Sequence, residues 1–96
     1  MSNSERQLQD YIIREGNLRG IYCRKVVAVG QTGFPDLFLA RGGRLIMVEL
    51  KSPTGRGRVS PKQEMEIKRM IASGIDARVI DSYEGADNVI NCLTGV

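Results

Sequence analysis

The residues best suited to chemistry are two carboxylates and a lysine near the middle of the chain, Asp36, Glu49 and Lys51. Gly42 and Gly43 form a two-residue hairpin signal, and a hairpin there pairs residues 41 and 44, so that all paired numbers sum to 85. In this register Asp36 lies directly opposite Glu49, and Lys51 points to the same face. Like charges in that position destabilise a sheet, and a divalent cation such as Mg²⁺ would neutralise them. The spacing therefore predicts a site for a hard divalent cation.

The alternative is a solvated strand face with an ordinary lysine–glutamate ion pair. The opposite face of the hairpin is expected to be core, because it carries only apolar residues: Leu37, Leu39, Ile46, Val48 and Leu50. The strand that holds Glu49 is apolar on both faces until its end, which predicts a central position in the sheet. Charged residues at the end of such a strand favour a functional site, although the spacing alone leaves both interpretations open.

The hydrophobic pattern predicts an α/β domain with a central mixed β-sheet flanked by helices, in the order helix, three strands, helix, strand, helix. Helices are expected over residues 4–15 and 81–93, and a third opens at Ser60 and Pro61 and stops at Gly74. Strands are expected over residues 22–29, 36–41, 44–52 and 77–80, with a turn at 31–33. The glycine- and arginine-rich segment 53–59 is expected to be a mobile basic loop.

Two helix starts carry the pattern of a capping box, a serine followed three residues later by a glutamine, at Ser4 with Gln7 and at Ser60 with Gln63. Glu5 lies three residues before Leu8 and therefore falls on the buried stripe of the first helix. Gln63 lies four residues before Ile67, so it should face the sheet as well as cap its helix.

The composition excludes several classes of site. The chain has 96 residues, enough for one domain, expected over residues 1–96, with a modest core. It contains no histidine, which removes histidine triads and histidine-based zinc sites. The two cysteines, Cys23 and Cys92, cannot form a four-thiolate site and are expected to be reduced thiols. The net charge of +3 is a weak indication of a polyanionic partner.

The sequence Gly-Phe-Pro-Asp at residues 33–36, followed by Glu-Leu-Lys at 49–51, resembles the Pro-Asp…(Asp/Glu)-x-Lys signature of restriction-endonuclease-like nucleases. An acidic residue in the first helix, Glu5, and the Ser60–Gln63 helix opening narrow the resemblance to the virus-type replication-repair nuclease family, VRR-NUC. The matched positions run from Glu5 to Gln63, and the chain resembles the stand-alone, phage-type members of that family.

The resemblance implies an endonuclease that hydrolyses phosphodiester bonds in DNA with Mg²⁺ or Mn²⁺. The implied metal ligands are Asp36, Glu49, the backbone carbonyl of Leu50 and, directly or through water, Glu5. Lys51 would orient or help deprotonate the attacking water and stabilise charge on the phosphate. Gln63 would hold Lys51 or that water.

Basic residues near the motif are candidates for binding DNA phosphates: Arg24, Lys25, Arg56, Arg58 and Lys62. Arg56 and Arg58 are the strongest of these, because their loop begins two residues after Lys51; an ordinary solvated basic surface is the alternative. The chain has five aromatic residues and no tryptophan, so it lacks an evident platform for stacking bases. We therefore expect recognition of DNA shape and backbone.

The resemblance further implies a homodimer that cuts branched DNA such as Holliday junctions. No signal peptide or membrane-spanning segment is evident, so a cytoplasmic location is expected, that of a bacterial host if the chain is phage-encoded. Two other functions remain open, a non-catalytic DNA-binding module that retains the fold and a sheet-based interaction protein. The intact set of Asp36, Glu49 and Lys51 disfavours both.

Overall fold

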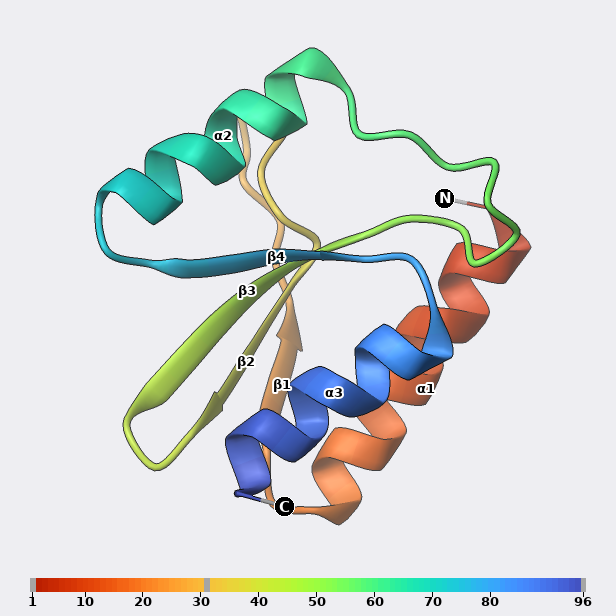
Figure 1. Cartoon of the computed structure of the whole chain (residues 1–96), viewed down its shortest axis with the longest axis vertical. Helices are drawn as coiled ribbons and strands as arrows, with labels where there is room; N and C mark the ends of the chain where they lie inside the picture. The colour runs from red at the N-terminus through yellow and green to blue at the C-terminus, as the bar shows by residue number, and fades with distance from the viewer. Residues whose placement is uncertain (1, 31, 96) are drawn as a thin grey trace.

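Four strands form one sheet with helices on both faces in the computed structural model, which describes residues 2–30 and 32–95 (Figure 1). In chain order the elements are α1 (Asn3–Leu18), β1 (Tyr22–Lys25), β2 (Leu37–Arg41), β3 (Arg44–Leu50), α2 (Pro61–Ala72), β4 (Asp76–Ile80) and α3 (Tyr83–Thr94). This is the predicted α/β order. The predicted turn at residues 31–33 begins at Gln31, which lies outside the described residues.

The sheet order is β1-β2-β3-β4. β2 pairs antiparallel with both β1 and β3, and β3 pairs parallel with β4. Arg41 pairs with Arg44 and Leu37 with Val48, so the register calculated from the Gly42-Gly43 turn is confirmed. β3 has a neighbour on each side, as its apolar sequence predicts. The parallel pair requires a crossover, which α2 supplies.

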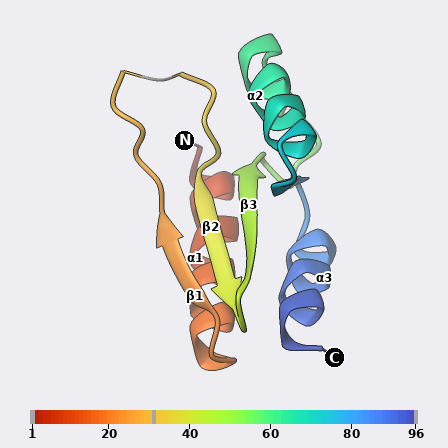
Figure 2. The same cartoon turned by 90° about the vertical axis from the view of Figure 1, so that its left-hand side faces the viewer.

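The two faces of the sheet are covered by different helices (Figure 1). α1 and α3 lie side by side on one face, where they bury the apolar side of the hairpin: Leu37, Leu39, Ile46, Val48 and Leu50. α2 covers the other face, where Met47, Met70 and Ala77 form a smaller cluster with Phe34 and Phe38 against it. Each fully buried leucine or isoleucine contributes about 1.5–3 kcal/mol to folding. Figure 2 shows β1, β2 and β3 side by side in that order, with α1 behind them.

The first helix is longer at both ends than predicted. Its N-cap is Ser2, whose hydroxyl accepts a hydrogen bond from the Glu5 N–H at 3.2 Å, so the expected capping box at Ser4 is wrong. The Ser4 hydroxyl instead contacts the Ser52 hydroxyl at 2.6 Å. At the other end, Gly16 does not stop the helix. A Cβ on Gly16 would lie 2.5 Å from the Cys23 Sγ, so this glycine permits close packing of α1 on β1.

The first strand ends at Lys25, four residues earlier than the β-branched run predicts. The Val26 N–H still donates to the Asp36 carbonyl at 2.8 Å, after which the chain leaves the sheet. Val27 and Val29 are 84% and 92% exposed, so their β-branched side chains have no sheet surface to cover. The other strand and helix ends lie within two residues of their predicted positions, the uncertainty usual for helix and strand ends.

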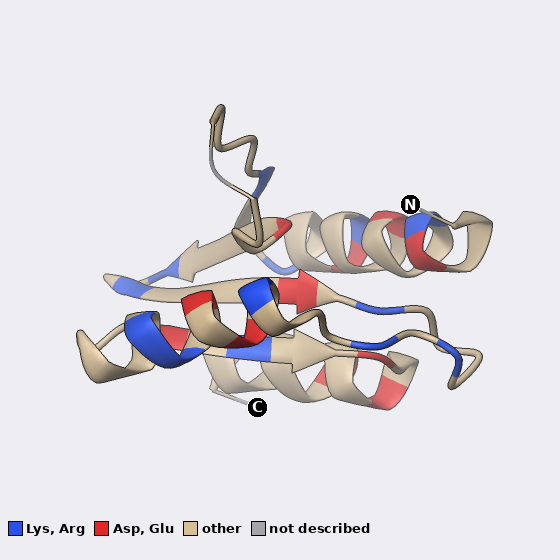
Figure 3. Cartoon of the chain, turned by 90° about the horizontal axis from the view of Figure 1, so that it is seen from above, with Lys and Arg blue, Asp and Glu red and all other residues tan. Residues whose placement is uncertain are grey.

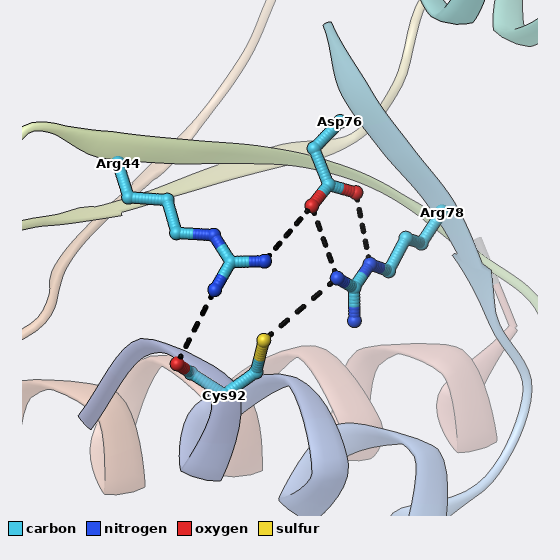
Figure 4. A network of polar contacts seen from close by, with 4 residues as sticks. All are labelled: Arg44, Asp76, Arg78 and Cys92. Atoms are coloured by element: carbon cyan, nitrogen blue, oxygen red, sulfur yellow. Dashed lines mark hydrogen bonds and ion pairs between the residues drawn. The ribbon is translucent and has the colours of Figure 1, made fainter. Parts of the chain in front are cut away.

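A network of ion pairs and hydrogen bonds lies at the end of the sheet near the β2–β3 turn (Figure 4). Asp76 accepts hydrogen bonds from Arg78 at 2.9 and 3.0 Å and forms an ion pair with Arg44 at 3.4 Å. Arg78 and Arg44 also contact the Cys92 sulfur and carbonyl, at 3.8 and 3.5 Å. These neighbours lower the pKa of Asp76, chiefly through its hydrogen bond with Arg78. The network therefore ties β3 and β4 to α3.

None of the helices in the described part of the chain has the length and apolar character needed to cross a membrane.

Candidate active site

Asp36 is fixed at the start of β2 by backbone and side-chain hydrogen bonds. Its N–H donates to the Val48 carbonyl at 2.9 Å, and its Oδ2 accepts from the Leu50 N–H at 2.8 Å. The carboxylate therefore lies against the β3 backbone between Glu49 and Lys51. This position agrees with the cross-strand pairing of Asp36 and Glu49 that the hairpin register predicts.

Glu49 is a buried acid with an incomplete set of partners. Its side chain is 1% exposed, and its Oε1 has no hydrogen-bond partner among the described residues. The pKa of Glu49 is raised to about 9, chiefly by burial. A hydrogen bond with Asp36 and the negative charges of Asp36 and Glu5 raise it further, and the positive charge of Lys51 lowers it. A buried carboxylate oxygen without a partner is costly, so this Oε1 is suited to a cation.

Lys51 lies half-buried where β3 ends, and the following loop folds back over it. A Cβ on Gly57 would lie 3.0 Å from the Lys51 Cβ and 2.9 Å from the Ser52 nitrogen. Only glycine permits this approach, so the loop that carries Arg56 and Arg58 is held beside Lys51. The segment expected to be a mobile basic loop therefore packs at Gly57 against Lys51 and Ser52.

The first turn of α2 is packed against the Gly-Phe-Pro-Asp segment. Gly33 has a φ of +84°, and a Cβ there would lie 2.9 Å from the Lys62 carbonyl carbon and 3.1 Å from the Gln63 nitrogen. Gln63 and Ser60 form the predicted capping box: the Gln63 Oε1 accepts from the Ser60 N–H at 2.9 Å and the Ser60 hydroxyl from the Gln63 N–H at 3.1 Å. In this arrangement the Gln63 side chain contacts Ser60 and not Lys51.

The N-terminus of α1 reaches the same end of the sheet through the hydrogen bond between Ser4 and Ser52. Glu5, in the first turn of α1, is half-buried and close enough for its charge to raise the pKa of Glu49. Residues 2–30 and 32–95 contain no group of three or more acidic, cysteine or histidine side chains placed to hold one ion. Asp36 and Glu49 are thus the adjoining pair, and Glu5 stands further away.

The basic residues predicted to contact DNA lie on three parts of the chain: the loop after β3, the first turn of α2, and β1. Arg56 and Arg58 belong to the loop after β3, whose blue positions extend beyond the end of that strand in Figure 3. The Lys62 ammonium donates to the Thr32 hydroxyl at 3.2 Å. The Arg24 guanidinium lies 4.2 Å from the centre of the Tyr22 ring, and Lys25 borders a cavity that Asp36 also lines.

Gln9 is a residue beside the site that the sequence pattern alone did not single out. It is 3% exposed, lines that cavity beside Asp36, and makes no side-chain hydrogen bond to the described residues. Its position in the sequence could have indicated this, because Gln9 lies three residues before Ile12 and is therefore a polar residue on the buried stripe of α1.

Comparisons with known proteins agree with this fold. A solved structure described as a VRR_NUC domain superposes with a TM-score of 0.84 at 26% identity, covering 94% of this chain and 97% of that one. A second, described as a VRR_NUC domain protein, gives a TM-score of 0.79 at 20% identity and covers 99% of this chain and 91% of the other. No curated protein matches the sequence. The family model of the VRR-NUC domain matches residues 13–84, and the chain therefore belongs to the VRR-NUC nuclease-domain family.

Proposed function

We propose that the 96 residues act as a single nuclease domain, a Mg²⁺- or Mn²⁺-dependent endodeoxyribonuclease that is specific for branched DNA such as Holliday junctions. The observation that carries the proposal is the buried Glu49 Oε1, which lacks a partner among the described residues and lies beside a second carboxylate, Asp36. The proximity of Asp36 disfavours the ionised form of Glu49 in the free protein, and a hard cation would favour the ionised form of both carboxylates.

The residues present fit a divalent cation held by oxygen atoms. Asp36 and Glu49 would supply one carboxylate each, the Leu50 carbonyl a third ligand, and Glu5 a contact through water. Mg²⁺ and Mn²⁺ accept such oxygen donors together with water and phosphate oxygens. A cation bound there supplies acidification of a water molecule and neutralisation of charge on the scissile phosphate.

Lys51 is the residue that acts on the attacking water. Among the described residues it forms none of the salt bridges, so its ammonium group can meet a phosphate oxygen or the water. It places a positive charge where negative charge develops in the transition state. Gln63 would assist from the first turn of α2 if its amide turned from the capping box toward Lys51.

Basic side chains would bind the DNA backbone on either side of this centre. Arg56 and Arg58 lie on the loop that packs over Lys51, Lys62 lies beside Gly33, and Lys25 lines the cavity beside Asp36. Arg24, which stacks on Tyr22, would contribute from β1. Interactions of this kind fix position on DNA and carry no base sequence information. Specificity for DNA shape follows.

The proposal is tested by incubating the protein with a labelled four-way junction and with a linear duplex of the same sequence, in Mg²⁺, in Mn²⁺ and in EDTA. We expect cleavage with either metal, faster on the junction, and none in EDTA. Binding of both DNAs without cleavage in any metal would identify a non-catalytic DNA-binding module instead.

Replacing Arg56 and Arg58 together by alanine should weaken DNA binding and reduce its dependence on salt. Each phosphate that a basic side chain neutralises contributes about 0.9 to the slope of log affinity against log salt concentration on duplex DNA, so the double variant should have a shallower slope. The slope is measured by fluorescence anisotropy from about 50 to about 200 mM salt.

The matched control for the loop variant is Arg14→Ala with Lys68→Ala. It removes the same charge from exposed faces of α1 and α2 and should leave the slope unchanged. Equal slopes for the two double variants would exclude the loop from the DNA interface.

The working unit is expected to be a symmetric homodimer. One chain carries one Asp36–Glu49–Lys51 site, whereas paired nicks in a junction need two sites, which a two-fold axis supplies. A core of this size also gains from burying apolar surface between subunits. Light scattering at micromolar concentration should report about twice the chain mass of 10.6 kDa. A monomer that makes symmetric paired nicks would contradict this prediction.

A further inference from the structure

A cavity of about 400 Å³ lies between α1 and the end of β1, next to the candidate metal ligands. It is lined by Arg6, Gln9 and Asp10 from α1, by Lys25, Val26 and Val27 at the end of β1, and by Asp36. Its volume is within the range of small-ligand sites, roughly 300–1,000 Å³. Because Asp36 belongs to both, whatever occupies the cavity lies directly beside the candidate active site.

The wall of the cavity includes a side-chain amide with no hydrogen-bond partner among the described residues. Gln9 is 3% exposed as a residue, and it lines the cavity. An occupant of the cavity can therefore hydrogen-bond to this amide. The carboxamide offers both donors and an acceptor, which complements the edge of a nucleobase.

The charges of the lining disfavour a free anion as the occupant. Arg6 and Lys25 are balanced by Asp10 and Asp36, so the lining has no net charge. A nucleoside is uncharged, and Val27, 84% exposed at the end of β1, offers an apolar surface for the face of its base. The two basic side chains are then placed to meet the phosphates that flank the nucleoside.

We infer that this cavity receives one unpaired nucleoside of the DNA strand, next to the phosphodiester bond at the candidate active site, with Gln9 hydrogen-bonded to its base. The inference rests on the proposed function and adds a reason for its substrate class. A base in a continuous duplex must leave its stack and its pair to enter the cavity, whereas a base in a gap or single-stranded arm is already unpaired, and a pair at a branch point lacks a continuous stack on one side. Branched DNA is therefore favoured.

The test uses 2-aminopurine, whose fluorescence is quenched by stacking, as the single unpaired base at a branch. Binding is measured in EDTA, so that no cleavage is needed for the readout. The wild-type protein should raise the fluorescence of this DNA several-fold and leave a fully paired 2-aminopurine duplex unchanged.

Two variants of the same helix give a matched comparison. Gln9→Leu should abolish the fluorescence rise and weaken binding of the branched DNA about tenfold, the loss expected for one to two hydrogen bonds. The affinity of this variant for duplex DNA should be unchanged. Its melting temperature should be unchanged or higher, because an apolar group replaces an amide that has no partner among the described residues. Gln7→Leu, on the exposed face of α1, should behave as the wild type.

The inference would be overturned if the wild type did not raise the 2-aminopurine fluorescence. It would also be overturned if Gln9→Leu and the wild type bound the branched DNA equally well. If the wild type still cleaved DNA with metal, the proposed function would stand. A fall in melting temperature for Gln9→Leu with its fluorescence rise intact would assign Gln9 a structural role and overturn the inference too. Failure to bind any DNA would overturn both proposals.

Discussion

Replacing Lys51 by alanine is expected to slow DNA cleavage at least about 100-fold while changing DNA affinity less than about threefold. Lys51 lies at the end of β3 beside Asp36 and Glu49, where it acts on the attacking water and on charge that develops only in the transition state. Ground-state binding depends instead on the basic side chains around the site. The fall should therefore appear in the single-turnover rate at saturating protein and not in the dissociation constant.

The control for this variant is Lys68→Ala. Lys68 is an exposed residue of α2 that pairs with Glu64 at 3.1 Å on the helix surface. It carries the same charge without contacting the site, so its removal should leave cleavage within about twofold of the wild type. Cleavage by Lys51→Ala at a near wild-type rate would remove Lys51 from the mechanism.

Replacing Glu49 by glutamine should abolish cleavage and at the same time stabilise the metal-free protein. The pKa of Glu49 is raised from 4.5 to about 9 by burial first, so the folded state favours the neutral acid. The unfolded chain releases this proton near pH 4.5, and the folded stability that depends on it is therefore complete below pH 4.5 and is lost progressively toward pH 9. At about pH 7.5 the glutamine variant, which does not titrate, should be more stable by about 2–4 kcal/mol.

The measurement is the melting temperature in EDTA at about pH 5.5, 7.0 and 8.5, together with cleavage in Mg²⁺. The wild-type melting temperature should fall across this range relative to the variant, and added Mn²⁺ should stabilise the wild type only. Glu64→Gln, which removes a carboxylate from the exposed surface of α2, should change stability by less than about 0.5 kcal/mol. A destabilised Glu49→Gln protein would mean that the carboxylate is satisfied by contacts within the chain.

The sheet could be predicted because its determinants are local in the sequence. The Gly42-Gly43 turn fixes the register of β2 and β3, and that register alone places Asp36 opposite Glu49. The capping box of α2 is likewise local, since Ser60 and Gln63 are three residues apart. The order of the elements follows from periodicity in the same way.

What could not be predicted depends on contacts between distant parts of the chain. Ser4 is a typical N-cap residue by its type and spacing from Gln7. Its hydroxyl instead contacts Ser52, 48 residues away, and the helix begins after Ser2. Gly16 is a residue type that commonly ends a helix, but here it lies within α1 and allows close packing on Cys23. The Glu49 Oε1 is buried and lacks a hydrogen-bond partner among the described residues, which spacing along one strand does not reveal.

Crystals soaked in Mn²⁺ test most directly whether Asp36 and Glu49 bind one divalent cation. Anomalous difference density should appear between the two carboxylates, within coordination distance of the Glu49 Oε1, and should be absent from crystals of the Glu49→Gln variant. Density at another position only, or carboxylates that point away from each other with Mn²⁺ present, would contradict the account.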